Sequence, residues 1–236
     1  MMTGVEKIAN LECIMVRSGK KATRCVVLLH GYGASFEDLA PLSEVLSVPS
    51  DVDWIFPNGP IEIALGWMMS GRAWFHIDMA ALNEAMMRGT HRNFSDLVPE
   101  GFLEASDMAK NLIDEVSEHY SSVIVGGFSQ GAMVSCDAVF RAKKPVAGLC
   151  LLSGNLVAKS RLSTVISPEK CPKVFQSHGE SDPVLSFASA TDLKDLLVEQ
   201  GVKVEFHPFK GQHEIPQDVC DSLGRFITHR FKDSVS

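Results

Sequence analysis

Several features are missing from this sequence of 236 residues. None of its six cysteines forms a C-x-x-C pair, and several lie in apolar runs such as Cys25-Val-Val-Leu-Leu, which favours reduced core thiols over disulfides or metal ligands. No stretch is apolar over the ~20 residues that span a bilayer, and no basic segment followed by an apolar one opens the chain. These absences predict a cytoplasmic protein without stable insertion into a membrane.

An excess of positive charge is missing as well. Lys and Arg number 22 and Asp and Glu number 29, so the formal net charge is −7. This charge repels phosphate backbones and argues against nucleic acid as a partner. No internal repeat and no Gly/Ser-rich linker divides the chain, and 45% of the residues are apolar, so we expect one packed domain over residues 1–236.

Short β-branched or apolar runs alternate with longer stretches of helical period along most of the chain. This alternation is typical of an α/β protein with a mainly parallel central sheet and helices on both faces. Apolar residues at steps of three and four predict helices around 102–116, 190–197 and 219–227. The expected strands are 24–30, 53–56, 122–128, 146–152, 173–177 and 202–207.

The rhythm of strands and helices stops between residues 57 and 99. An excursion of this length is usually functional or mobile, so we expect an inserted loop or lid-like segment. Its aromatic and methionine side chains suit an adaptable apolar cavity for substrate, and a small core beneath a loop explains them equally well. The substrate-binding candidates are Trp67, Met68, Trp74 and Phe75.

A G-x-S-x-G motif, Gly127-Phe-Ser-Gln-Gly131, follows an expected strand and precedes an expected helix. At about 7% usage for each specified residue, the motif alone would occur by chance in about 0.08 of chains of this length. Its context is more specific, because a strained turn that exposes a serine needs small neighbours on both sides. Ser129 is therefore the candidate nucleophile.

A serine hydroxyl needs a base within hydrogen-bond reach, and the base needs a carboxylate that orients it. On this architecture both partners should follow the serine, in loops beyond the carboxyl ends of strands. Asp182 lies in such a loop after the strand at 173–177, and His213 lies in the loop that follows the strand at 202–207. We predict the triad Ser129, Asp182 and His213, with neighbouring Glu214 as a surface group.

Acyl transfer also needs hydrogen-bond donors for the developing oxyanion. The residue after the nucleophile usually supplies one backbone N–H, and the loop after an earlier strand supplies another. Gln130 takes the first position. Tyr32 takes the second, in the turn His30-Gly-Tyr-Gly33, where a structural turn with glycines at positive φ would look the same.

Together the four motifs Leu-His-Gly-Tyr-Gly, Gly-Phe-Ser-Gln-Gly, His-Gly-Glu-Ser-Asp-Pro-Val and Gln-His-Glu-Ile-Pro resemble the phospholipase/carboxylesterase family of α/β-hydrolases, which includes acyl-protein thioesterases. The resemblance covers about residues 25–231. It implies the α/β-hydrolase fold, the same triad and the same two oxyanion donors. The segment Arg72-Ala-Trp-Phe75 also resembles the family's Trp-Phe segment beside the acyl site.

These observations predict a serine carboxylesterase that hydrolyses esters of small or medium acyl chains through an acyl-enzyme. No metal and no cofactor is required. The alternatives with the same chemistry are a lysophospholipase and an acyl-protein thioesterase, so the substrate is a small-molecule ester or a thioester. An alternative of another class is a catalytically silent binding protein. Exposed apolar surface in segment 57–99 leaves a homodimer open.

Overall fold

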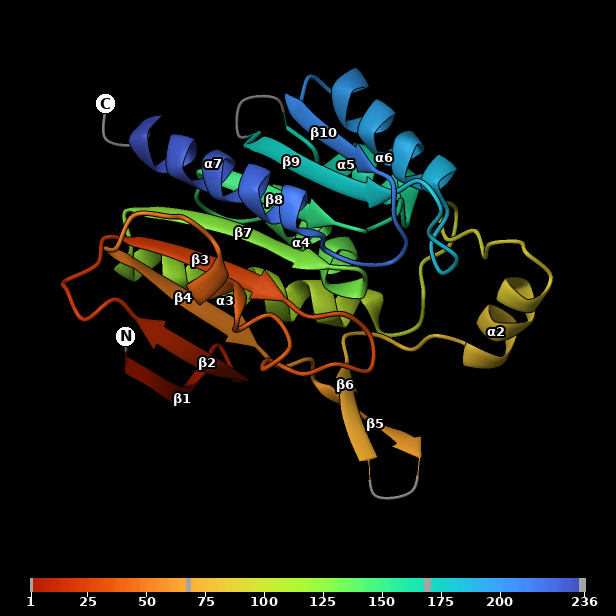
Figure 1. Cartoon of the computed structure of the whole chain (residues 1–236), viewed down its shortest axis with the longest axis horizontal. Helices are drawn as coiled ribbons and strands as arrows, with labels where there is room; N and C mark the ends of the chain where they lie inside the picture. Colours follow the sequence, from red (N-terminus) through yellow and green to blue (C-terminus); the bar gives the residue numbers. More distant parts are fainter. Residues whose placement is uncertain (1, 67–68, 168–170, 234–236) are drawn as a thin grey trace.

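The computed structural model describes residues 2–66, 69–167 and 171–233, and its centre is an eight-stranded sheet (Figure 1). The strand order is β1-β2-β4-β3-β7-β8-β9-β10, and every pair from β4 to β10 is parallel, whereas β1 and β2 join antiparallel. The strands are β1 (Met2–Ile8), β2 (Leu11–Arg17), β3 (Arg24–Leu29), β4 (Val52–Pro57), β7 (Ser122–Phe128), β8 (Gly148–Leu152), β9 (Lys173–Gly179) and β10 (Val204–Phe209). This mostly parallel sheet confirms the expected α/β class.

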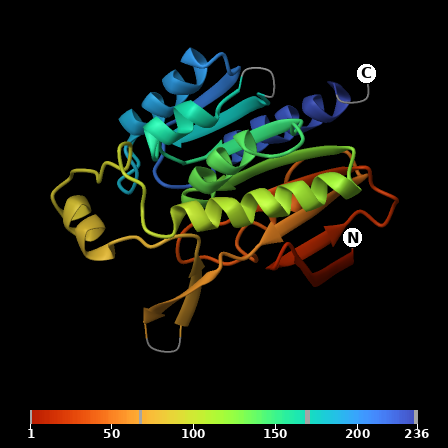
Figure 2. The same ribbon diagram turned by 180° about the vertical axis from the view of Figure 1, so that it is seen from behind.

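Helices cover both faces of the sheet, as the two opposite views show (Figures 1 and 2). One apolar cluster joins α3, α4, α5 and α6 to one face, and a second joins α1 and α7 to the other. The helices of these layers are α1 (Leu42–Val45), α3 (Phe102–His119), α4 (Gln130–Phe140), α5 (Lys159–Val165), α6 (Phe187–Glu199) and α7 (Gln217–Asp233).

The six strands expected from sequence all form, with ends shifted by at most two residues. β3, β7 and β8 are almost entirely buried, as strands with helices on both faces should be. The sequence interpretation missed β1 and β2. β1 is an edge strand that is mostly exposed, so it lacks the apolar run by which the inner strands are recognised.

Segment 57–99 contains regular structure, so the expectation that the rhythm of strands and helices stops there is wrong. β5 (Ile61–Gly66) and β6 (Met69–Ala73) form an antiparallel hairpin, and helix α2 (Met79–Met87) follows with Asp78 as its N-cap. The hairpin and α2 project from the body of the protein (Figures 1 and 2). Both are short and largely exposed, which leaves little apolar periodicity in the sequence.

All six cysteines are free thiols, and five of them are buried. Burial raises the pKa of Cys13 to about 12 and raises the pKa of Cys25 well above its ordinary value. These thiols are therefore protonated core residues, as expected. Within the described part of the chain, no helix is long and apolar enough to cross a membrane.

Candidate active site

Ser129 lies in the sharp turn between β7 and α4. Its backbone has φ 54° and ψ −117°, a conformation that residues other than glycine rarely adopt. The turn is held on both sides, because the Ser129 N–H donates to the carbonyl of Leu152 at 2.8 Å and its carbonyl accepts from Ala132 and Met133. The strain presents the hydroxyl beyond the carboxyl end of β7.

The glycine at position 131 is required by close packing around this turn. A Cβ there would overlap the backbone carbonyl of Leu29, at the end of the neighbouring strand β3. Any larger residue would push the turn that contains Ser129 away from β3. The small neighbours expected from the motif are thus explained by how closely β3 approaches the start of α4.

His213, the candidate base, reaches Ser129. It lies in the loop between β10 and α7, and its Nε2 is 3.0 Å from the Ser129 Oγ. The imidazole packs on Phe128, with ring centroids 4.8 Å apart. On the other side of the ring, Nδ1 is 2.7 Å from Oδ2 of Asp182. The ring with its proton on Nδ1 donates to the carboxylate, and the free Nε2 accepts from the serine hydroxyl.

Asp182 lies in the loop after β9, and its carboxylate is fully engaged. Oδ1 accepts from the backbone N–H groups of Val184 and Leu185 at 2.8 and 2.9 Å, while Oδ2 faces His213 and, at 3.3 Å, the buried His178. Burial raises the pKa of Asp182, but the hydrogen bond and charge of His213 and the two backbone donors outweigh it, so the pKa lies below its ordinary value. The carboxyl group is an anion that fixes the imidazole.

The structure therefore brings together the three side chains that the sequence selected. They come from three loops that all follow carboxyl ends of parallel strands, whose arrowheads point to one side of the sheet (Figure 1). Glu214, the neighbour of His213, is exposed and accepts from the N–H of Gln212 at 3.0 Å. Its side chain is not part of the hydrogen-bonded series Ser129, His213 and Asp182.

The two expected oxyanion donors lie close to the nucleophile. Tyr32 and Gln130 both line the same cavity as Ser129 and His213. The N–H of Gln130 belongs to the first turn of α4, where N–H groups have no partner within the helix. The N-terminal end of this helix also favours a developing negative charge.

That cavity has a volume of about 150 Å³ and mostly apolar walls. Phe75 lines it, as expected, together with Met79 and Leu82 of α2 and Phe94 of the loop that follows. Further lining side chains are Ile77, Met133, Val184 and Leu185. Sequence reasoning missed these aliphatic residues because nothing in their local pattern separates a cavity wall from a core position.

Trp74 does not line this cavity. It is fully buried beside it, and its indole N–H donates to the backbone carbonyl of His30 at 3.0 Å. The substrate-binding role expected for Trp74 is therefore replaced by a contact with the loop that carries Tyr32. The other two candidates, Trp67 and Met68, lie outside the described residues.

Three polar side chains at the site were not predicted. His178 donates from Nε2 toward the carbonyl of Leu185 at 3.0 Å beneath the acid loop, and His91 lies 2.8 Å from the carbonyl of Asp182. The side chain of Gln130 bonds to the backbone of Trp74 and of Phe75. Of the three, only His178 could have been identified from the sequence, because it lies in the same motif as Asp182.

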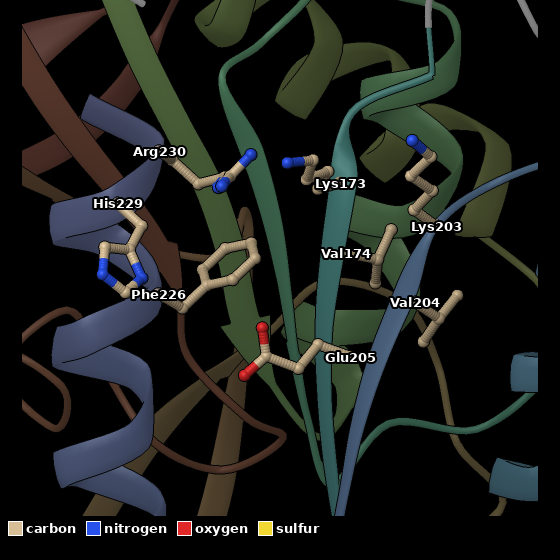
Figure 3. A pocket seen from close by; sticks show the side chains of 8 residues that line it. All are labelled: Lys173, Val174, Lys203, Val204, Glu205, Phe226, His229 and Arg230. Carbon is tan, nitrogen blue, oxygen red and sulfur yellow. The ribbon is translucent and has the colours of Figure 1, made fainter. Parts of the chain in front are cut away.

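A second cavity, of about 230 Å³, lies at the opposite end of β9 and β10 (Figure 3). Lys173 and Arg230 face each other above the ring of Phe226, and both also pair with Asp233, at 3.7 and 2.9 Å. Since Lys173 is the first residue of β9, this cavity lies at the amino ends of the strands. It is separate from the triad.

Comparison with known proteins identifies the family of this chain. Residues 11–230 match the model of the phospholipase/carboxylesterase family. The chain belongs to this family. Acyl-protein thioesterase 1 of Mycosarcoma maydis is 30% identical over 224 residues, covering 86% of this chain and 88% of the relative. The same enzyme of Debaryomyces hansenii is 30% identical, covering 89% and 92% of the two chains.

Solved structures show the same fold for this family member. SOBER1 of Arabidopsis thaliana has a TM-score of 0.72 at 25% identity and covers 88% of this chain and 99% of its own. Esterase PE8 has a TM-score of 0.76 at 24% identity and covers 97% and 99%. The fold is that of an α/β-hydrolase, and family membership supports esterase or thioesterase activity.

Proposed function

We propose that this protein is a serine carboxylesterase that hydrolyses carboxylic esters of short or medium acyl chains. The observation that carries the proposal is the chain of contacts from the Ser129 Oγ through His213 to Asp182, with distances of 3.0 and 2.7 Å. A neutral base that accepts from serine and is oriented by a carboxylate is the arrangement that activates a hydroxyl.

The reaction proceeds in two steps. The Ser129 Oγ attacks the ester carbonyl while His213 Nε2 takes the hydroxyl proton, and the carbonyl electron pair moves onto oxygen, where the N–H groups of Gln130 and Tyr32 donate to it. The tetrahedral intermediate collapses, and the alcohol leaves with the proton from His213. Water, deprotonated by His213, then attacks the acyl-enzyme; the bond to the Ser129 Oγ breaks, Ser129 takes the proton back from His213, and the acid is released.

The size of the cavity favours short chains. A dry apolar cavity of about 150 Å³ holds a ligand of the size of benzene, and the cavity beside Ser129 has about this volume. We therefore expect acyl groups of about six carbons or fewer to fit without rearrangement of α2. Longer chains would need α2 to move or would extend into solvent.

A series of p-nitrophenyl esters from acetate to palmitate tests this proposal. We expect kcat/KM to be highest at about four to six acyl carbons and to fall for the palmitate ester. A fluorophosphonate probe should also label the wild type, with loss of fluoride and a new bond to the Ser129 Oγ, and should not label Ser129→Ala. Absence of labelling and hydrolysis in the wild type would contradict the proposal and favour a binding protein.

The second candidate function is an acyl-protein thioesterase. The relatives in Mycosarcoma maydis and Debaryomyces hansenii carry that name, and in each case the alignment covers most of this chain and most of the relative. Esters and thioesters pass through the same acyl-enzyme, so a matched pair of octanoyl ester and octanoyl thioester separates the two. A large preference for the thioester would support this candidate, and a lysophospholipid in the same series tests the remaining alternative.

A further inference from the structure

The segment of residues 71–75, at the end of β6, lies against the loop that follows β3. The N–H of Gly33 donates to the carbonyl of Arg72 at 2.9 Å, and the N–H of Arg72 donates to the carbonyl of Ala34 at 2.8 Å. Gly71 allows this contact, because a Cβ there would overlap the carbonyl oxygen of Gly33. This pairing fixes the loop that carries the N–H of Tyr32.

A side chain strengthens the same contact. The indole N–H of Trp74 donates to the carbonyl of His30, two residues before Tyr32, at 3.0 Å, and the indole is fully buried. Buried hydrogen bonds of this kind are costly to break, because each leaves an unpaired donor or acceptor. Segment 71–75 and the loop after β3 are therefore held to each other by three hydrogen bonds.

The other side of segment 71–75 is held by Gln130. Its Oε1 accepts from the N–H of Trp74 at 2.7 Å, and its Nε2 donates to the carbonyl of Phe75 at 2.8 Å. A side-chain amide offers both an acceptor and donors, so it pairs with these two backbone groups as a neighbouring strand would. Gln130 is 1% exposed, which removes competition from water.

We propose that the Gln130 side chain is a positioning residue for the oxyanion hole: through segment 71–75 it fixes the spacing between its own backbone N–H and that of Tyr32. The proposal rests on the proposed function, since it assumes an oxyanion at Ser129. Donors aid the reaction when they are already placed where the charge develops, so looser spacing lowers the rate. The hydrogen bonds that join Ser129, His213 and Asp182 do not involve this amide.

Gln130→Met in the full-length protein tests the proposal, because methionine keeps the backbone N–H and the approximate length but loses both side-chain bonds. Removing one oxyanion donor outright costs about 10²–10³ in kcat, so loosening one should cost about 10- to 100-fold. We expect this fall in kcat for p-nitrophenyl acetate, with KM changed less than threefold. Acetate is chosen because its acyl group fills little of the cavity that Phe75 lines.

A trifluoromethyl ketone gives a second readout that loss of stability alone would not move. Ser129 adds to its carbonyl, the proton passes to His213 and the oxyanion lies between the same two donors. We expect its inhibition constant to rise in Gln130→Met by about the factor by which kcat/KM falls, as for any transition-state analogue. An unchanged inhibition constant and an unchanged kcat would overturn the proposal.

Two further variants keep the test decisive. Ser135→Ala removes another buried side-chain hydrogen bond of α4, to the carbonyl of Ala132 at 3.1 Å, and should leave kcat and the inhibition constant unchanged. An equal fall in this control would overturn the positioning role. Trp74→Phe removes the hydrogen bond to the carbonyl of His30 and should lower kcat in the same way. This variant keeps the proposal testable if Gln130→Met fails to fold.

The double variant and the wild type complete the design. Because Gln130 and Trp74 act through one segment, the double variant should lose less than the product of the two single losses. A full product would show independent effects and overturn the proposal. A wild type that fluorophosphonate does not label would instead refute the proposed function, so the two failures are distinguishable.

Discussion

The triad loops and the outer part of segment 57–99, residues 76–99 with helix α2, are built in opposite ways. In the loops, Asp182 is buried and has hydrogen bonds to both carboxylate oxygens, and Ser129 is held in a strained conformation by its neighbours. In the segment, α2 leaves the side chain of Met86 37% exposed and that of Met87 89% exposed. The triad side chains are thus placed on loops fixed to the sheet, whereas residues 76–99 carry few buried contacts of their own.

The two regions meet at the substrate cavity. Met79, Leu82 and Phe94 of residues 76–99 line this cavity together with Ser129. The ring of His91 donates to the carbonyl of Asp182 at 2.8 Å, so the segment also touches the loop of the catalytic acid. We therefore expect large effects on rate from changes in the triad loops and small effects on selectivity from changes in residues 76–99.

Replacing Ser129 with alanine should have the largest effect. The nucleophile is lost while the fold is retained, so kcat should fall by about 10⁶, the scale seen in serine protease triads. Steady-state hydrolysis of p-nitrophenyl butyrate measures this, with circular dichroism as the check on folding. An unaltered rate in the purified variant would end the assignment of Ser129.

Asp182→Asn should lower kcat by about 10⁴, because an amide at this position holds the imidazole in the wrong tautomer. KM should change little, since Asp182 does not line the cavity. The matched control is Glu214→Gln, which changes an exposed carboxylate next to His213 and should alter kcat less than about twofold. Similar losses in both variants would show that His213 is oriented by something other than Asp182.

Much of this catalytic end could be predicted from the sequence. Ser129, Asp182 and His213 each lie in a loop that follows a strand, and the parallel topology places the carboxyl ends of such strands on one side. Order along the chain and position after a strand were therefore enough to select them. Asp137 also follows Ser129 along the chain but does not lie in a loop after a strand: it lies within α4, where it pairs with Arg141 and Arg161.

The contacts that the sequence could not predict depend on pairs far apart in the chain. Gln130 bonds to residues 74 and 75, which are 56 and 55 positions away, and His91 contacts Asp182, which is 91 positions away. No local spacing encodes such pairs. Trp74 was assigned to the cavity for a related reason: an aromatic pair predicts burial, but only the packing decides which ring faces the substrate and which faces the loop.

Stability below neutral pH should depend on His30, beneath the loop that carries Tyr32. Burial lowers its pKa from 6.5 to about 4, and the neutral ring accepts from the N–H of Gly59 at 2.9 Å. Between these values the unfolded chain binds a proton that the folded protein does not, so the stability present above pH 6.5 is lost as the pH falls towards 4. The shift corresponds to roughly 3 kcal/mol.

Urea unfolding of the wild type and of His30→Gln at several pH values between 4 and 7 measures this effect. Glutamine cannot titrate, so the variant should lose part of the dependence on pH, although it is less stable at pH 7. Identical slopes in the two proteins would show that His30 does not keep its low pKa. The region beneath the loop that carries Tyr32 would then be more accessible to water than the burial of His30 indicates.

The smallest effect should come from α2. Leu82 is buried and lines the cavity, so Leu82→Ala should enlarge it and raise the ratio of kcat/KM for the decanoate ester to that for the butyrate ester by about three- to tenfold. Met87→Ala changes an exposed side chain of the same helix and should leave the ratio as it is. An equal shift in both variants would mean that α2 limits acyl-chain length through its motion and not through the side chains that line the cavity. Selectivity would then not depend on the lining residues of α2.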